Sequence, residues 1–189
     1  MPTSVLLYLL LILVLYAERL IELLVSRRNI RRLRARGGRE YGRGHFPAMV
    51  LFHTLFPAVA AAEVLVLERA FPGVAGWIFL AVAVLAQALR WWTIATLGDA
   101  WSVRIVVLPD AAPVTGGPYR LVQHPNYLAV VLEVAAIPLI HGAWLTSAVA
   151  TLLNLWLLKV RIPLEERALG PRYAQAFPRS GSANPRETP

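Results

Sequence analysis

The sequence contains no cysteine, which excludes disulfide bonds, thiolate metal sites and cysteine nucleophiles. Several motifs of soluble enzymes are also absent, namely a G-x-G-x-x-G after a strand pattern, G-x-x-x-x-G-K, H-E-x-x-H and G-x-S-x-G. The four histidines are scattered along the chain, so no metal site is predicted. The sequence therefore lacks the signatures of the common nucleotide-binding, metal-dependent and serine-hydrolase folds.

Polar sequence is scarce as well. Charged residues make up 16% of the chain and hydrophobic residues 57%, and the mean hydropathy is +0.55. The predicted fold class is all-α, a polytopic integral membrane protein with about five transmembrane helices. The expected spans cover residues 5–24, 47–67, 74–97, 125–140 and 143–160. The last two are joined by a short turn at residues 141–142 and form a helical hairpin, whose first helix is short for a bilayer.

Acidic residues are few, and the formal net charge is +8. Eight arginines against the single acid Glu40 lie in the loop between residues 26 and 46. Arginine-rich loops stay in the cytoplasm, so this loop and the basic C-terminus are expected inside and the N-terminus outside. Contact with anionic lipid headgroups explains the basic residues, and no nucleic-acid partner is predicted because aromatic residues are not interleaved with the first six arginines.

A polar stretch at residues 115–127 leads directly into the apolar run that ends at Ile140. Pro125 suits the first turn of a helix, and His124 stands at the capping position. Helix starts favour anions because their N–H groups are free and the helix dipole is positive there. The stretch is thus either a binding site for an anionic group of a small molecule or an ordinary turn that begins a helix.

Three polar clusters are expected at the same cytoplasmic face, at residues 90–101, 118–127 and 161–166. Arg90 stands beside Trp91 and Trp92, a makeup that fits either a membrane-interface anchor or the wall of a site. A hairpin with both ends in polar sequence forms a pocket between membrane and cytosol. The convergence of the clusters favours a site over solvated helix ends.

These residues resemble a known family. The motif G-P-Y-R-L-V-Q-H-P-N-Y at residues 117–127, with Glu133 downstream and R-x-x-x-E-E-x-x-L at residues 161–169, is similar to the isoprenylcysteine carboxyl methyltransferase family. The resemblance covers roughly residues 85–177, and the segment 89–101 resembles bacterial members that O-methylate polyketide-derived lipids. The family often has arginine where this chain has Gln123. The chain divides accordingly into N-terminal helices at 1–84, a catalytic region at 85–177 and a disordered tail at 178–189.

The resemblance implies an S-adenosylmethionine-dependent O-methyltransferase. The C-terminal hairpin would bind S-adenosylmethionine from the cytosol, and a lipidic acceptor would arrive from the bilayer. Arg161 or Arg90 would orient a carboxylate acceptor, whereas Glu165 would be the base for a phenolic or enolic one. The cofactor-binding residues implied are Gly117, Pro118, Tyr119, His124, Pro125, Tyr127, Leu128, Glu133 and Glu166.

Other functions stay open at this point. Phospholipid N-methyltransferases and NADPH-dependent lipid reductases use related C-terminal hairpins, and a non-enzymatic membrane scaffold would use the same polar residues only to pack its helices. The acceptor is expected to be a lipid, because the apolar spans give it lateral access, but prenyl, acyl and polyketide lipids all fit. The sequence does not indicate an oligomeric state.

Overall fold

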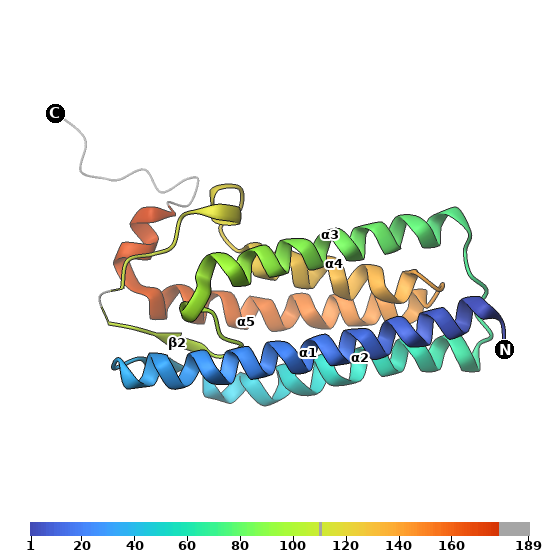
Figure 1. Ribbon diagram of the computed structural model, residues 1–189, viewed down its shortest axis with the longest axis horizontal. Helices are drawn as coiled ribbons and strands as arrows, with labels where there is room; N and C mark the ends of the chain where they lie inside the picture. Colours follow the sequence, from blue (N-terminus) through green and yellow to red (C-terminus); the bar gives the residue numbers. More distant parts are fainter. Residues whose placement is uncertain (110, 178–189) are drawn as a thin grey trace.

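The computed structural model describes residues 1–109 and 111–177, and the disordered tail predicted at 178–189 lies outside the described residues. Five helices run alongside one another (Figure 1). They are α1 (Thr3–Ala35), α2 (Phe46–Val66), α3 (Val74–Leu97), α4 (Pro125–Leu139) and α5 (Trp144–Ala176). Two short strands, β1 (Arg39–Tyr41) and β2 (Ile105–Val107), pair antiparallel at one end of the bundle, which we call the strand end. The all-α prediction is confirmed.

The helices have the length and surface of membrane spans. α1, α2, α3 and α5 are long and apolar enough to cross a membrane, whereas α4 has 15 residues and is shorter. Large apolar side chains point outward from the bundle, for example Leu13 at 64% exposure and Leu152 at 69%. A surface of this kind is stable in lipid and not in water. The chain is therefore a polytopic integral membrane protein.

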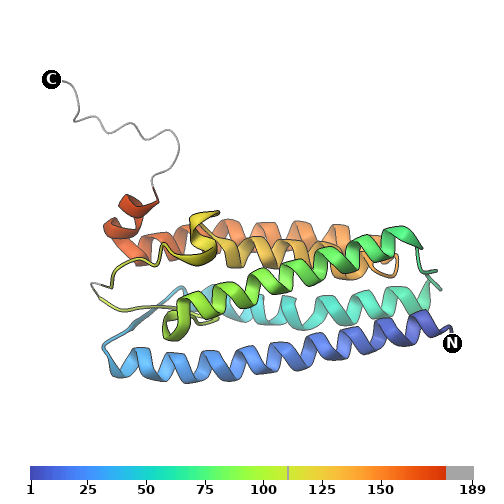
Figure 2. The ribbon, with the colours of Figure 1, turned by 45° about the horizontal axis from the view of Figure 1, so that its top comes forward.

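The short helix α4 is central to the bundle. It packs against both α3 and α5, and Figures 1 and 2 show it among the long helices. Small and branched residues let it approach its neighbours closely, as Ala129 and Val134 are almost completely buried. Because most of α4 is buried against α2, α3 and α5, its polar first turn lies within the strand end.

α1 is longer than predicted and continues to Ala35 instead of ending near residue 24. Arginine is a good helix former, and no helix breaker stands before Gly37. The added turns are anchored to the segment that follows α3. The Asn29 side-chain amide donates to the carbonyls of Gly98 at 3.0 Å and Trp101 at 2.9 Å, and Ser26 accepts from the Val103 N–H at 3.0 Å.

α5 also exceeds its predicted span of 143–160 and reaches Ala176. It continues through Pro163 and changes direction at Gly170, whose φ of 77° lies in the left-handed region that glycine adopts without strain. Figure 1 shows the red end of α5 turned away from the bundle axis at the strand end. The kink places the last turn of α5 close to the start of α4.

Glu40 on β1 ties the strand end together. Its side chain is buried and accepts from Arg34 at 2.5 Å and from Arg104 at 2.7 Å, which joins the end of α1 to the segment before β2. Burial acts to raise the pKa of Glu40, but the hydrogen bonds from Arg104 and Arg34 outweigh it, so this pKa lies below its ordinary value. The carboxylate is ionised at neutral pH and holds the short sheet in place.

Candidate functional site

The start of α4 is built by a tight turn. A 3-10 turn at Gly117–Arg120 precedes it, and Gly117 has a φ of +57° and lies so close to Thr96 that an added Cβ would be 2.5 Å from the threonine oxygen. Pro125 is the first residue of the helix and is buried. His124 makes no side-chain cap, so the first N–H groups of α4 have no side-chain partner there. Pro125 has no N–H, and the N–H groups of Tyr127 and Leu128 donate to the His124 carbonyl at 3.1 Å, which leaves the N–H of Asn126 at this helix start.

The kinked end of α5 meets this helix start. The His124 Nε2 lies 3.0 Å from a Glu166 carboxylate oxygen, and the Gln123 amide donates to the same oxygen at 3.2 Å. The rings of His124 and Tyr173 lie 6.2 Å apart between centroids, and the Tyr173 hydroxyl donates to the Gln123 carbonyl at 3.4 Å. The structure thus brings the two ends of the hairpin together, as the motif at 117–127 and the paired acids predict.

Arg161 lies deeper between α4 and α5 and is only 5% exposed. Its Nε donates to the Tyr127 hydroxyl at 2.9 Å, and its Nη2 donates to the Val103 carbonyl at 2.8 Å. The Tyr127 hydroxyl donates in turn to Glu165. Within residues 1–109 and 111–177, no carboxylate forms an ion pair with Arg161. A buried guanidinium without a counter-ion favours an anionic or partly negative ligand beside it.

A cavity opens between α4, α5 and the segment that contains β2, and we call it the strand-side cavity. Its polar lining includes Arg104, Tyr119, His124, Glu165 and Tyr173. Burial, together with the nearby Glu165 and Tyr173, raises the pKa of Tyr119, so that its hydroxyl stays protonated and able to donate. The cavity combines carboxylate, aromatic and hydroxyl groups around the start of α4.

A second cavity lies between α1, α2, the first two turns of α4 and the middle of α5, and we call it the membrane-side cavity. Leu20 of α1 and Val50 of α2 line it and are 59% and 43% exposed on the outer surface. The cavity therefore reaches the lipid-facing surface between α1 and α2. An apolar molecule in the bilayer has lateral access to it.

The two cavities meet at one set of residues, which we call the neck. The side chains that line both cavities are Trp101, Ser102, Asn126, Tyr127 and Arg161. The side-chain oxygen of Asn126 is buried and has no hydrogen-bond partner in the described part of the chain. Sequence reasoning did not single out Trp101, Ser102 and Asn126 as site residues, although Asn126 lies inside the recognised motif and that position was the available signal.

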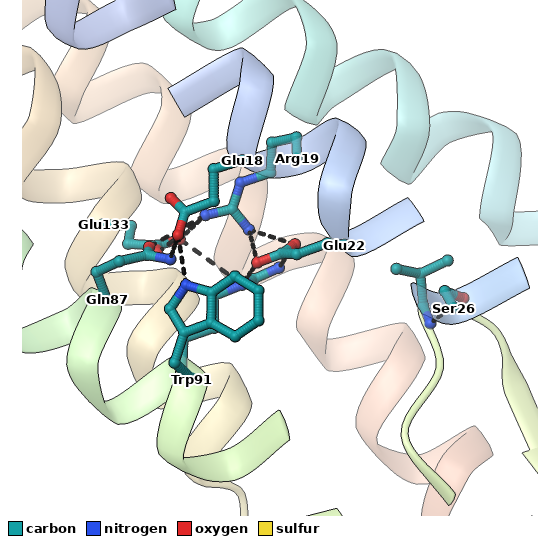
Figure 3. A network of polar contacts seen from close by, with 9 residues as sticks. Glu18, Arg19, Glu22, Ser26, Gln87, Trp91 and Glu133 are labelled. Carbon is teal, nitrogen blue, oxygen red and sulfur yellow. Dashed lines mark hydrogen bonds and ion pairs between the residues drawn. The ribbon is translucent and has the colours of Figure 1, made fainter. Parts of the chain in front are cut away.

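An ionic cluster lines the membrane-side cavity through Arg19, Glu22 and Arg90. Figure 3 shows the polar contacts of this cluster. The Arg90 guanidinium donates to both oxygens of Glu22, at 2.5 and 2.7 Å, and is buried. Arg19 bridges Glu22 at 2.8 Å and Glu133 at 3.0 Å. Arg90 lines the membrane-side cavity, but its guanidinium group is bound by the Glu22 carboxylate. Arg90 therefore lies in a wall of the same cavity that Arg161 lines, whereas Glu165 lines the strand-side cavity.

Of the nine predicted cofactor-binding residues, Tyr119, His124 and Tyr127 line the strand-side cavity, and the other six do not. The Glu133 carboxylate is bound by Arg19 and lies 3.6 Å from the Arg90 Nη1. Leu128 is 40% exposed on the outer surface of α4 and lines neither cavity. Leu128 differs from Tyr127 in direction because neighbouring positions on a helix point to different sides, and Glu133 lies six positions farther along α4.

Figure 3 also shows how the rest of the ionic cluster is satisfied. The Glu18 carboxylate accepts from the Trp91 indole at 2.5 Å and from the Gln87 amide. Glu18, Arg19 and Glu22 occupy one stretch of α1, whereas their partners come from α3 and α4. Polar groups inside a membrane usually face one another, and this cluster fastens α1 to α3 and α4.

Taken together, the fold and the site define an integral membrane helical protein with a lipid-facing cavity and a second, more polar cavity that share the neck residues in their walls. The sequence model of the isoprenylcysteine carboxyl methyltransferase (ICMT) family matches residues 78–171. The chain is 37% identical to the uncharacterized protein YpbQ of Bacillus subtilis (strain 168) over 161 residues, which cover 85% of this chain and 95% of that protein. It is 30% identical to an uncharacterized protein of Haemophilus influenzae over 165 residues, which cover 87% and 93%. No solved structure matches the chain.

The chain belongs to the isoprenylcysteine carboxyl methyltransferase family. The match covers α3 from residue 78, the start of α4, the hairpin turn and most of α5. It therefore includes His124, Tyr127, Arg161 and Glu165, which surround the neck and the strand-side cavity.

Proposed function

We propose that the chain is an integral membrane methyltransferase that uses S-adenosylmethionine and methylates an oxygen atom, carboxylate or hydroxyl, of a lipidic acceptor. The observation that supports this most is the pair of cavities that meet at the neck. One is the more polar and is built on the hairpin, and the other reaches the lipid-facing surface. A water-soluble donor and a membrane-bound acceptor need such an arrangement, because each must arrive from its own phase.

The strand-side cavity has the groups that S-adenosylmethionine requires. Its carboxylate suits the N–H of Asn126 and the positive end of the helix dipole at the start of α4, beside His124. Glu165, which lines the cavity, and Glu166, which lies 3.0 Å from His124, suit its amino or ribose hydroxyl groups. The aromatic rings of Tyr119 and Tyr173 suit its adenine. S-adenosylmethionine supplies a methyl group on a sulfonium cation, which carboxylates and aromatic faces stabilise. The unpartnered oxygen of Asn126 gives the neck one more acceptor for a ligand.

The neck has the groups that an oxygen acceptor requires. Arg161 stabilises negative charge on the reacting oxygen, and Tyr127 and Glu165 lie directly beside it. Displacement at a methyl group needs the two reacting atoms in line, so holding both molecules at a shared neck supplies most of the rate. Burial of the neck also keeps water from competing as an acceptor.

The N-terminal and C-terminal parts of the chain form different parts of this proposed site. Residues 85–177 supply the hairpin and the strand-side cavity, and residues 1–84 supply α1 and α2, which wall the membrane-side cavity. The arginine-rich stretch at the end of α1 lies at the strand end, so we place this end in the cytosol, with the N-terminus outside and the C-terminus inside. S-adenosylmethionine is then taken from the cytosol.

Calorimetry on the detergent-purified full chain tests the cofactor. We expect saturable binding of S-adenosylmethionine with no competition from NADPH, since a lipid reductase of related architecture would prefer NADPH. A His124→Ala variant should bind S-adenosylmethionine more weakly at unchanged thermal stability. Absence of saturable binding at millimolar S-adenosylmethionine would contradict the proposal, and a change of stability alone would favour a scaffold. Methylation of a phosphatidylethanolamine amine would assign the chain to N-methylation instead.

A further inference from the structure

The lipid-facing stripe of α1 continues directly into arginines. Leu20 and Leu24 on this stripe are 59% and 56% exposed. The positions that follow at helical spacing are occupied by exposed arginines, namely Arg27, Arg28 and Arg31. At 1.5 Å per residue, Arg27 lies about 4.5 Å beyond Leu24 along the helix axis and Arg31 about 10 Å beyond it. The headgroup layer on each side of the hydrocarbon core is roughly 5 to 8 Å thick. The three arginines therefore leave the bilayer at the level of the headgroups.

These three arginines, which we call the outer arginine face, have no acidic partner in the described part of the chain. Within residues 1–109 and 111–177, none of them forms an ion pair or a side-chain hydrogen bond. Two other arginines near the end of α1 are paired, Arg32 with Asp99 at 2.7 Å and Arg34 with Glu40 at 2.5 Å. Each arginine close to an anionic membrane surface strengthens binding by a factor of about five. The outer arginine face is thus suited to the phosphate groups of anionic phospholipids.

The opposite side of the same turns holds a segment that walls both cavities. This linking segment, residues 98–107, follows α3 and supplies Trp101 to the neck. The Asn29 side-chain amide fastens it to α1 by donating to the carbonyls of Gly98 and Trp101, at 3.0 and 2.9 Å. Asn29 is completely buried, and it points away from Arg31 because positions two apart lie on opposite sides of a helix. A ligand that holds the outer side of these turns therefore also holds the linking segment.

Val103 carries this connection into the neck. Its N–H donates to the Ser26 hydroxyl oxygen of α1 at 3.0 Å, and its carbonyl accepts from the Arg161 Nη2 at 2.8 Å. The backbone of one residue thus joins α1 to the buried guanidinium. Within the bundle, 22% of the most apolar stretch of α1 is buried. Most of the span contacts lipid, so the lipid contributes to the position of Ser26.

We infer that the outer arginine face is a docking surface for anionic phospholipids of the cytosolic leaflet, and that this docking holds the linking segment against the neck. The inference rests on the cytosolic placement of the strand end and on the methyl-transfer site proposed above. Anionic headgroups hold the last turns of α1 at the membrane surface, and Asn29 and Ser26 transmit this position to the linking segment. Without anionic lipid these turns lose their partners, and the segment opens more often.

Hydrogen exchange of the full chain in lipid nanodiscs tests this coupling. One set of nanodiscs contains phosphatidylcholine, and the other an equal mixture of phosphatidylcholine and phosphatidylglycerol. We expect the amides of residues 98–107 to exchange about tenfold more slowly in the mixture, because part of the attraction of three arginines to the surface is transmitted to them. The triple variant Arg27→Gln, Arg28→Gln and Arg31→Gln should lose this difference. The ratio that remains in the variant measures the effect of surface charge on the intrinsic exchange rate.

Three controls separate charge from structure. Lysine at all three positions of the outer arginine face keeps the charge and should retain the slow exchange. Asn29→Ala should exchange fast in both bilayers while native mass spectrometry still detects bound phosphatidylglycerol, because the docking surface is intact and its link to the segment is cut. Lys159→Gln combined with Arg167→Gln removes two exposed charges of α5 and should behave as wild type.

The outcomes are distinguishable. Equal exchange of the wild-type linking segment in the two bilayers, or an unchanged difference in the triple glutamine variant, would overturn the docking. Slow exchange caused by inorganic phosphate in phosphatidylcholine alone would assign the arginines to a soluble anion and overturn the lipid surface.

Calorimetry in the same nanodiscs should show several-fold tighter binding of S-adenosylmethionine in the mixture. Equal affinities would overturn the claim that docking completes the site. Failure to bind S-adenosylmethionine in either bilayer would remove the proposed function, whereas the exchange difference would still decide the docking.

Discussion

The Arg161 Nε and the Tyr127 hydroxyl lie 2.9 Å apart, on helices that run in opposite directions, at the neck that the more polar and the lipid-facing cavities share. The two residues are separated by 34 positions in the chain and are joined only because α4 and α5 form a hairpin. This contact places a cation and a hydroxyl where a soluble donor and a membrane-bound acceptor would be in reach of each other. The predictions below follow from it and from the contacts that support it.

Replacement of Arg161 by glutamine should lower kcat/KM for methyl transfer by about 100-fold or more, because one stabilising donor for negative charge is removed. Lysine should not restore the rate, since an ammonium group cannot reproduce the planar contacts to Tyr127 and Val103. Lys159→Gln, at an exposed position of the same helix, is the control and should behave as wild type. Radiolabelled methyl transfer into lipid measures the effect, and an active Arg161→Gln variant would remove Arg161 from the mechanism.

Glu166→Gln should weaken the binding of S-adenosylmethionine by about tenfold, as expected for the loss of a charge-assisted hydrogen bond. The carboxylate of Glu166 is fixed by His124 at 3.0 Å and by Gln123 at 3.2 Å, so it is held toward the start of α4. Calorimetry measures the change. Glu68→Gln, in the exposed turn after α2, should have no effect. Equal affinities for the Glu166 variant and wild type would show that Glu166 does not contact the cofactor.

The ionic cluster should contribute to stability more than to cofactor affinity. Glu22→Gln leaves Arg90 buried without its main partner and should lower the free energy of unfolding by about 3 kcal/mol. The double variant Glu22→Gln with Arg90→Gln should cost less than the sum of the single changes, because Arg19 and Glu133 remain as a neutral pair. Detergent-induced unfolding measures both. Strict additivity would mean that Glu22 and Arg90 do not stabilise each other.

The strand end should loosen in acid. The pKa of Glu40 is lower in the folded chain than its ordinary value of 4.5, so its ion pairs stabilise the fold fully above that value and are lost as the pH falls through the lower, folded pKa. Hydrogen exchange of the amides of β1 and β2 should therefore speed up as the pH falls below 4.5, after correction for the intrinsic rate. In Glu40→Gln the corrected exchange should be fast at every pH. Equal protection in wild type and variant would contradict the role of Glu40.

The helices and the hairpin were predictable from the sequence because they depend on local patterns. Apolar runs placed α2 and α3 nearly to the residue, and Pro125 marked the start of α4. The ends of α1 and α5 were not predicted, because a membrane-span pattern stops where apolar residues stop. The added turns of α1 are held by the tertiary contacts of Asn29, and α5 continues past a kink at Gly170.

In the site, the motif residues near α4 and the paired acids of α5 were recognisable, and the structure places His124 beside Glu166 and Tyr127 beside Glu165. The partners of the ionic cluster were not recognisable. Arg90 binds Glu22 at a separation of 68 positions and Arg19 binds Glu133 at a separation of 114, and no local pattern specifies such pairs. Asn126 was missed as a neck residue because only the fold shows that two cavities meet there.

The most direct test of the central claim is mass spectrometry of lipids after incubation of a lipid extract with the purified chain and S-adenosylmethionine labelled in its methyl group. The account predicts a lipid that is heavier by the labelled methyl group in place of a hydrogen, formed by the wild-type chain and by Lys159→Gln but not by Arg161→Gln. Label that never enters the lipid fraction, or that enters it equally with Arg161→Gln, would contradict the claim that a methyl group is transferred at the neck between the two cavities.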